Sequence, residues 1–305
     1  MHVLRTLDQL ASIRRPVVAA AGVFDGVHRG HQQVIRLCHE RATALGAEPW
    51  LMTFDPHPLR IVQPSAAPAL LTTLPLKLDL AAGLGLAGAM VIPFTHDFAA
   101  LEPAAFLDHL LERLPLLRGL VIGENWRFGR QAKGNVALLR ELAAQRNLDV
   151  AAATPVLSGA SPVSSTRIRE AIARGDLDEA TALLGRPHAV RGAVIHGQKR
   201  GRRLGFPTAN LDVRGCAIPP SGIYAARVTL DGHPHPGALY LPAQPEPQHG
   251  ALEVHLIDYT GDLYGRELDV AFIRKIRDDD RRFTREADLI QQIRDDVAAI
   301  RSLLA

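Results

Sequence analysis

Short apolar segments alternate with longer amphipathic segments over the first 185 residues of the chain. The apolar segments are typical of buried strands, because they are short and end in turn residues; they are residues 16–24, 47–54, 87–94, 117–123 and 148–156. Between them, apolar residues recur three and four positions apart, which predicts helices over residues 31–45, 104–114 and 135–145. Apolar strands separated by helices predict an α/β domain built on a parallel sheet that is covered on both faces.

After residue 185 the pattern changes to short runs in which apolar and polar positions alternate. These runs are bounded by Gly, Pro and Asp and cover residues 189–197, 222–241, 251–259 and 266–277. They predict a small antiparallel β-barrel or sandwich. A terminal helix follows, because one helical face carries Leu289, Ile293, Val297, Ile300 and Leu304. We therefore expect two domains, residues 1–185 and 186–305, divided where Gly185 and Pro187 interrupt the pattern.

Composition narrows the class of protein. Hydrophobic residues make up 47% and charged residues 22% of the chain, which is ordinary for a soluble globular protein. Cys38 and Cys216 lie too far apart in sequence for a zinc motif or a disulfide framework, which favours a reducing cytoplasm. Aromatic residues are only 5%, so the stacking platforms of single-strand nucleic-acid binders are scarce. The longest apolar stretch is shorter than a membrane span.

Four residues follow the ends of predicted strands of the first domain and should line one edge of the sheet: His28, Pro56, Thr95 and Glu124. Ligands of parallel sheets bind beyond the carboxyl ends of the strands. This edge is therefore the first candidate site.

The stretch "GVFDGVHRGHQ" places His28 and His31 where a strand turns into a helix. Taken alone, HxxH is typical of two exposed helix histidines, and a metal site would need a third ligand. The strand-turn-helix context favours phosphate binding instead, because the N–H groups at a helix N-terminus attract anions. Gly30 would let the backbone approach the ligand closely.

Two further segments carry candidate phosphate or metal ligands. Residues 164–166 have the composition of a helix cap and precede Arg167 and Arg169, whose guanidinium groups can bind pyrophosphate. A capped surface helix is the alternative. In "LGFPTANL", Thr208 and Asn210 would place their oxygens on one side of an extended segment, a donor set that suits Mg²⁺. The glycine-rich basic loop before them could cover phosphates, or it could be a solvated or nucleic-acid-binding loop.

Taken together, these blocks resemble one known family. "GVFDGVHRGHQ", "TFDPHP", "IGENWRFGRQAKGN" and "SSTRIREAIARGDLDEATALLGRP" are followed in order by "HGQKRGRRLGFPTANL" and "SGIYAARV". They resemble the bacterial bifunctional riboflavin kinase/FMN adenylyltransferase family over nearly the whole chain. The resemblance implies a Rossmann-like nucleotidyltransferase domain followed by a riboflavin kinase-like barrel. It also implies flavins, ATP and Mg²⁺ as the small-molecule partners, with no nucleic acid and no membrane, in a monomer or weak homo-oligomer.

For the first domain, the resemblance implies adenylylation of FMN by ATP, giving FAD and pyrophosphate. His28 and His31 would hold the triphosphate and stabilise the transition state. The other implied substrate-binding residues are Gly22, Phe24, Asp25, Gly30, His57, Asn125, Ser164, Ser165, Thr166, Arg167 and Arg169. Trp126 stands where the family more often has Phe; it could contact a flavin ring or belong to the core.

For the second domain, the resemblance implies phosphorylation of riboflavin to FMN. Glu253, on the polar face of an alternating strand, would deprotonate the attacking hydroxyl. The implied binding residues are Gly197, Gly205, Pro207, Thr208 and Asn210, with Thr208 and Asn210 also on Mg²⁺.

Residues 237–250 depart from the family pattern. They lack its N-x-G-x-x-P-T-F block and carry Pro242, Pro245 and Pro247, which disfavour strand pairing. This departure motivates an alternative, an FMN adenylyltransferase with an impaired or altered kinase domain. A flavin-binding regulator or carrier without turnover is the second alternative.

Overall fold

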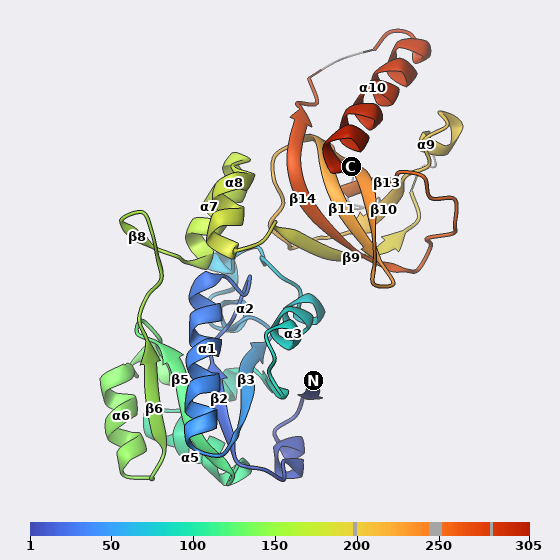
Figure 1. Ribbon diagram of the computed structural model, residues 1–305. Coiled ribbons are helices and arrows are strands. Elements are labelled where there is room, and N and C mark those ends of the chain that lie inside the picture. The colour runs from blue at the N-terminus through green and yellow to red at the C-terminus, as the bar shows by residue number, and fades with distance from the viewer. Residues whose placement is uncertain (198–199, 244–251, 281–282) are drawn as a thin grey trace. The chain divides into compact units, whose positions relative to one another are not determined.

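The structure is a computed structural model that describes residues 1–197, 200–243, 252–280 and 283–305. The chain forms two compact units, drawn in Figure 1: residues 1–68 with 74–164, and residues 69–73 with 165–305. Residues 165–185 pack with the second unit, where Leu177 joins the core of the barrel. The division into functional domains at residue 185 stays a proposal.

The first unit is built on a six-stranded parallel sheet, as the apolar segments predicted. Its strands are β1 (His2–Leu4), β2 (Val17–Ala21), β3 (Glu48–Asp55), β4 (Gly88–Pro93), β5 (Leu117–Gly123) and β6 (Asp149–Ala153). They lie in the order β1-β4-β3-β2-β5-β6, and neighbouring strands pair in parallel. β2, "VVAAA", is buried throughout, as expected of a central strand with helices on both faces. β1 is the one strand of this sheet that the pattern did not predict.

Helices cover both faces of this sheet and bury two separate cores. The helices are α1 (Arg29–Ala44), α2 (Pro58–Val62), α3 (Leu74–Gly83), α4 (His96–Ala99), α5 (Pro103–Arg113) and α6 (Val136–Ala144). One core joins Met52 and Leu120 of the sheet to Phe106 of α5. The other joins Val18 and Val121 to Ile35 of α1. The shorter elements are η1 (Asp8–Ser12), η2 (Pro64–Ala66), η3 (Arg130–Ala132), and the strands β7 (Leu157–Ser158) and β8 (Ser161–Pro162).

The second unit contains a closed six-stranded barrel, as the alternating pattern predicted. Its strands are β9 (Ala189–Ile195), β10 (Ala209–Asp212), β11 (Gly222–Leu230), β12 (His233–Leu241), β13 (Leu252–Leu256) and β14 (Glu267–Arg277), in the order β10-β13-β12-β11-β14-β9. Helices α7 (Ser165–Arg174) and α8 (Leu177–Leu184) precede it, and α9 (Arg200–Arg203) lies between β9 and β10. Every second residue of a barrel strand enters the core, as in β13, where Leu252, Val254 and Leu256 are buried.

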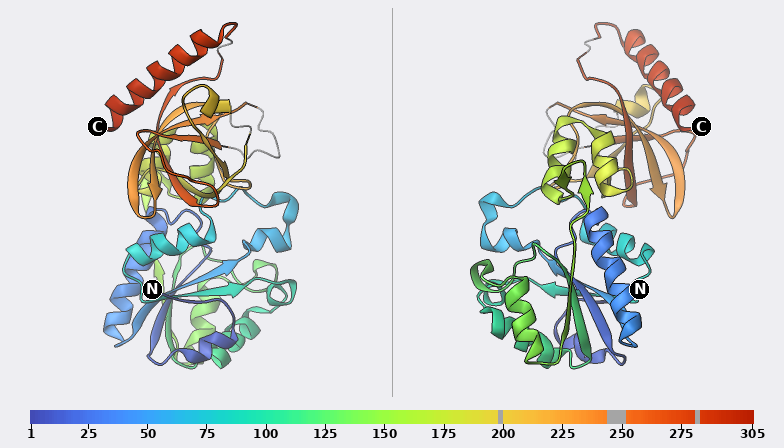
Figure 2. Two further views of the ribbon diagram at one scale, coloured as in Figure 1. Left: turned by 90° about the vertical axis from the view of Figure 1, so that its right-hand side faces the viewer. Right: turned by 60° about the vertical axis from the view of Figure 1, so that its left-hand side comes forward.

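The terminal helix α10 (Glu286–Leu304) lies along the outside of the barrel, as Figure 2 shows. Its predicted apolar face packs there: Ile300 is fully buried against Ala225 and Ile257. Beside it the Arg277 guanidinium donates to the Asp296 carboxylate at 2.9 Å, with both side chains largely buried. The helix therefore belongs to the barrel's packing. Within the described part of the chain, none of the helices has the length and apolarity needed to cross a membrane.

The prolines expected to disfavour ladder pairing follow the last residue of β12. Residues 237–240 pair with both β11 and β13, in line with the strand pattern over residues 222–241. Pro242 comes after the last strand residue, Leu241, so it does not interrupt this pairing. Pro245 and Pro247 lie outside the described residues, as do residues 244–251 as a whole.

Candidate active sites

The first site is formed by the turn that joins β2 to α1. Three of its residues have positive φ: Phe24 (54°), Gly26 (88°) and Val27 (42°). Phe24 and Asp25 are almost fully buried, at 1% and 2% exposed. The Phe24 ring also accounts for a glycine at position 22, because a Cβ on Gly22 would lie 3.2 Å from the phenyl ring. The turn is therefore held in an unusual conformation by its surroundings.

His28 and His31 are brought together at the end of this turn. His28 caps α1: its Nδ1 accepts a hydrogen bond from the His31 N–H at 3.3 Å. The two imidazole rings stack with centroids 3.6 Å apart and planes 17° apart. Gly30 suits this stack, because a Cβ there would lie 3.0 Å from Cε1 of His28 and would press on the ring. The structure thus gives Gly30 a packing role that the sequence did not predict.

The His31 ring carries a polar atom that the described residues do not satisfy. Its Nδ1 is buried and has no hydrogen-bond partner among them. Burial, then the neighbouring His28 and Lys77, lower the pKa of His31 well below its ordinary value. The free protein therefore holds a neutral imidazole at neutral pH. An unsatisfied buried ring nitrogen is the kind of group that a bound ligand completes.

Lys77 is a residue of this site that sequence reasoning missed. It lies on α3 and is 6% exposed, and its Nζ donates to the Val23 carbonyl at 2.8 Å. Burial lowers the pKa of Lys77, and the carboxylates of Asp25 and Asp55 partly offset that effect. The signal in the sequence is a single lysine in the apolar run "LPLKLDL".

Other predicted residues of the first domain occupy loops after β3 and β5. His57 caps α2, its Nδ1 accepting from the Leu59 N–H at 3.2 Å. Asn125 is exposed in the turn that follows β5. Trp126 stacks on Phe128 with ring centroids 4.9 Å apart and packs near Phe106. Of the two interpretations of Trp126, core packing is the one these contacts support.

The segment of residues 164–169 begins a helix, as predicted, since α7 starts at Ser165. Arg167 donates from Nε to the Glu179 carboxylate at 2.9 Å. Arg169 donates from Nε to the Ala69 carbonyl at 2.6 Å. Both guanidinium groups therefore make protein contacts within the second unit. The phosphate roles of residues 164–169 stay predictions.

The second site lies on the outer face of the barrel, where β10 and β13 are paired. Asn210 is in register with Glu253, and the Thr208 hydroxyl donates to the Glu253 carboxylate at 3.1 Å. Ala209 and Leu211 belong to the barrel core, so Thr208 and Asn210 share the opposite side, as their spacing predicted. On the same side as Glu253, His255 pairs through Nδ1 with the Pro207 carbonyl at 2.8 Å. Thr208, Asn210 and Glu253, which were predicted from two separate segments, are thus brought together.

The glycine loop lies directly on these side chains. A Cβ on Gly197 would lie 2.1 Å from Nδ2 of Asn210, and one on Gly201 would lie 3.0 Å from Oγ1 of Thr208. Gly205 turns the chain after α9 with a φ of 86°. Gln198 and Lys199 lie outside the described residues. The glycines therefore allow the loop to contact Thr208 and Asn210 closely.

The donor atoms at this site are oxygens of a hydroxyl, a carboxamide and a carboxylate. This set fits Mg²⁺, which takes few protein ligands and keeps waters and substrate phosphates as the others. The described residues contain no cluster of three or more His, Cys, Asp or Glu side chains suited to a metal. Thr208 and Asn210 would hold such an ion together with substrate phosphates, beside the Glu253 carboxylate.

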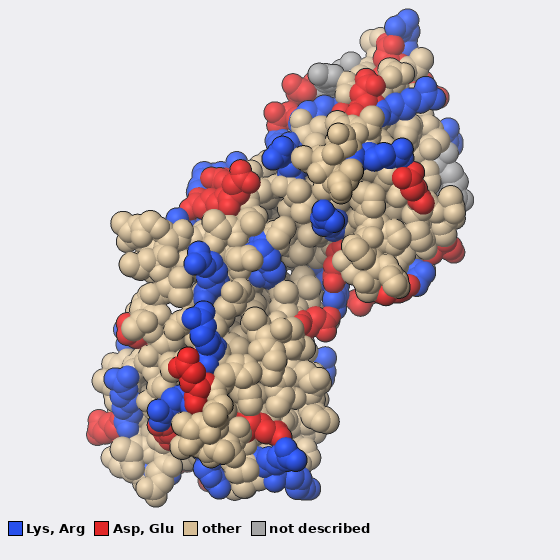
Figure 3. Space-filling model, in the orientation of Figure 1, with Lys and Arg blue, Asp and Glu red and all other residues tan. Residues whose placement is uncertain are grey.

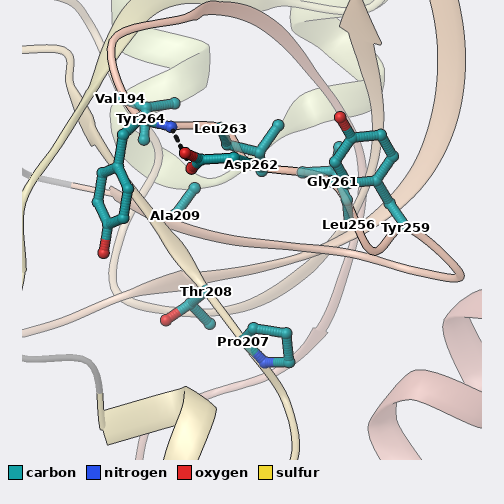
Figure 4. Close-up of a pocket in the computed structure, with 10 residues that line it drawn as sticks. All are labelled: Val194, Pro207, Thr208, Ala209, Leu256, Tyr259, Gly261, Asp262, Leu263 and Tyr264. Atoms are coloured by element: carbon teal, nitrogen blue, oxygen red, sulfur yellow. Dashed lines mark hydrogen bonds between the residues drawn. The ribbon is translucent and has the colours of Figure 1, made fainter.

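A pocket begins at Thr208 and extends toward the loop that follows β13, as Figure 4 shows. Its walls mix polar and apolar groups, and its lining residues are Val194, Pro207, Thr208, Ala209, Leu256, Tyr259, Gly261, Asp262, Leu263 and Tyr264. The Asp262 carboxylate accepts from the Tyr264 N–H at 3.1 Å, which fixes the loop's turn. The Tyr264 ring packs against His196 with centroids 4.3 Å apart. Sequence reasoning did not predict this pocket.

Two family models match the chain. One, described as FAD synthetase, matches residues 10–167, and the other, described as riboflavin kinase, matches residues 184–304. The first range includes His28 and His31, and the second includes Thr208, Asn210 and Glu253.

Curated proteins resemble the chain over its whole length. The chain is 37% identical to the bifunctional riboflavin kinase/FMN adenylyltransferase of Pseudomonas fluorescens, covering 100% of this chain and 98% of that protein. It is 35% identical to the protein of the same description from Escherichia coli K12, covering 98% and 97%. A solved structure described as a macrolide-efflux protein from Streptococcus pneumoniae matches with a TM-score of 0.84 and 26% identity, covering 99% of each chain.

Proposed function

The chain belongs to the family of bifunctional riboflavin kinases/FMN adenylyltransferases, and from this premise we propose which of its residues perform the two reactions. The protein is a transferase that phosphorylates riboflavin to FMN and adenylylates FMN to FAD, with ATP as the implied co-substrate. The stacked pair of His28 and His31, with its unsatisfied buried nitrogen, is the observation that carries the first assignment.

In the adenylyl transfer, a phosphate oxygen of FMN attacks the α-phosphorus of ATP, and the bond to the β-phosphate oxygen breaks. No protein nucleophile is required, so the enzyme contributes positioning and charge stabilisation. His28 and His31 lie at the N-terminus of α1, where the backbone N–H groups and the helix dipole favour the triphosphate. A His31 tautomer protonated at Nδ1 would donate to a phosphate oxygen and satisfy that buried atom.

In the kinase reaction, a riboflavin hydroxyl attacks the γ-phosphorus of ATP and ADP leaves. Glu253 accepts the hydroxyl proton, and its hydrogen bond from Thr208 holds the carboxylate in place. Thr208 and Asn210 would hold Mg²⁺, which would neutralise charge on the transferred phosphoryl group. The described side chains of this site match what the kinase reaction needs, which favours two working sites over an impaired kinase.

The pocket beside Thr208 suits the base of ATP. The pocket and the proposed metal site share Thr208. An ATP molecule with its phosphates at the metal site would therefore place its base in the pocket. Its lining includes the rings of Tyr259 and Tyr264 beside polar groups, a combination that suits a planar purine with hydrogen-bonding edges. We expect Tyr264→Ala to raise the KM for ATP in riboflavin phosphorylation about tenfold through lost contact area, with little change in kcat. Steady-state kinetics of riboflavin phosphorylation with varied ATP measures this KM. A rise in the KM for riboflavin alone would assign the pocket to the flavin instead.

Gly197→Ala is expected to impair the kinase reaction selectively. The added Cβ would overlap the Asn210 carboxamide, so the loop or the side chain must move by more than 1 Å to reach ordinary contact. A displacement of that size costs about 100-fold in rate when it misplaces a reacting group. Comparing the rates of FMN formation and FAD formation in one preparation measures this selective loss. Gly83→Ala, an exposed glycine at the end of α3 with open space around it, is the control for glycine substitution in general; equal losses in both variants would contradict the explanation.

The setting that fits this function is a reducing cytoplasm. Neither Cys38 nor Cys216 is part of a disulfide in the described structure. On the face drawn in Figure 3, basic and acidic side chains are interspersed over both units, unlike the continuous basic stripe of nucleic-acid-binding surfaces. This mixture of charges supports action on small flavins and ATP, and we propose a monomer or weak homo-oligomer.

The decisive experiment is incubation of the purified protein with Mg·ATP and either riboflavin or FMN, followed by chromatography of the flavins. Passage of riboflavin through FMN to FAD is expected. Conversion of FMN alone would favour an impaired kinase site. Flavin binding without conversion would favour the regulator or carrier alternative.

A further inference from the structure

Lys77 carries a charge at a buried position of the first unit. It lies between Leu76 and Leu78 on α3, and only 6% of it is exposed. Lysine is rarely buried to this extent unless partners compensate for the lost hydration. Its contacts therefore indicate what it does.

The ammonium group of Lys77 holds the start of the turn that carries the two histidines. Nζ donates to the Val23 carbonyl at 2.8 Å and lies 3.4 Å from Oγ1 of Thr53. The Thr53 hydroxyl donates to the same carbonyl at 2.9 Å. The next residue, Phe24, takes the chain out of β2 with a φ of 54°. Two side chains, from α3 and β3, therefore fix one peptide group where the unusual turn begins.

The charges around Lys77 connect it to His31. Asp25 in the turn and Asp55 at the end of β3 favour its charged form against burial. The positive groups that act on the His31 ring are His28 from the turn and Lys77 from α3, and both oppose protonation of His31. Removing Lys77 would remove one of these positive charges, so the pKa of His31 would rise.

We propose that Lys77 is a positioning residue for adenylyl transfer, which holds the Val23 peptide so that the His28–His31 pair is in place before ATP binds. The inference rests on the proposed function of the first unit. A buried ammonium group bound to a backbone carbonyl keeps the turn from relaxing, and such preorganisation lowers the barrier to transfer. Its charge also keeps His31 neutral in the free enzyme.

The test uses Lys77→Met in the full-length chain, with riboflavin phosphorylation as the internal control. The kcat for FAD formation from FMN is expected to fall about 100-fold, while riboflavin phosphorylation continues at the wild-type rate. Nuclear magnetic resonance titration of the His31 ring is expected to show a higher midpoint in Lys77→Met than in the wild type. A purely structural support would not move that midpoint.

Thr53→Val is the matched control, because it removes the other hydrogen bond to the Val23 carbonyl and leaves the charge in place. We expect it to lose less activity and to leave the His31 midpoint unchanged. Equal losses in both variants with no change in the midpoint would overturn the proposal, as would wild-type kcat in Lys77→Met. If Lys77→Met does not fold, a wild-type His31 midpoint at or above about 6.5 still overturns the proposal, because it contradicts the charge effect. Absence of FAD formation by the wild type would instead refute the proposed function.

Discussion

Replacing His28 and His31 together with alanine is expected to abolish FAD formation from FMN while riboflavin is still converted to FMN. The adenylyl transfer has no protein nucleophile, so its rate depends on the groups that bind and stabilise the phosphates. Each single substitution is expected to lower kcat about 100- to 1000-fold, the usual loss when one preorganised donor is removed. Chromatography of flavins from parallel reactions with riboflavin and FMN measures both rates.

The effects of the two single substitutions should not add. The rings stack at 3.6 Å and His28 caps the His31 N–H, so removing either one also disturbs the other. His39→Ala is the matched control on the same helix, since the His39 ring is hydrogen-bonded to the Leu84 carbonyl at 3.0 Å and not to the turn that carries the pair. FAD formation within about tenfold of wild type in the double variant would contradict the role assigned to the pair.

Glu253→Gln is expected to stop riboflavin phosphorylation without affecting FAD formation from FMN. The amide keeps the size of the carboxylate and can still accept the hydrogen bond from Thr208, but it cannot take the proton of the attacking hydroxyl. Loss of a general base costs about 100- to 10,000-fold in rate. Initial rates of FMN formation from riboflavin, with saturating Mg·ATP, measure the loss.

The control for this substitution is Glu267→Gln, an exposed glutamate at the start of β14. It changes the net charge of the chain by the same amount, so both activities should remain at wild-type levels. Riboflavin phosphorylation by Glu253→Gln within about tenfold of wild type would show that another group accepts the proton.

The general plan of the fold followed from the chain's pattern because burial imposes a period on each element. β2 is apolar throughout since both faces of a central parallel strand are covered, and β13 alternates since one face of a barrel strand is exposed. The pattern failed for β1, whose three residues are too few to show a period. It succeeded for β12, because the alternating run over residues 222–241 ends at Leu241, the last residue of that strand.

The candidate sites could be predicted as far as their residues lie together in the sequence. The motif around His28 and His31 and the pair Thr208 and Asn210 are local, and residue type and spacing were sufficient to find them. Lys77 could not be assigned in this way, because it reaches the first turn from a helix some 50 residues further along the chain. The pocket reaching Tyr264 likewise needs walls from several strands and a loop.

The sequence by itself therefore determined the two fold types, the family, and the residues that lie within its continuous motifs. Only the tertiary structure decided which groups come into contact. These contacts are the stacking of His28 on His31, the hydrogen bond from Thr208 to Glu253, and the hydrogen bond from Lys77 to the Val23 carbonyl. The reason is physical, because local patterning reflects which face of an element is buried. Contacts between distant residues depend on strand register and packing, and these exist only once the chain has folded.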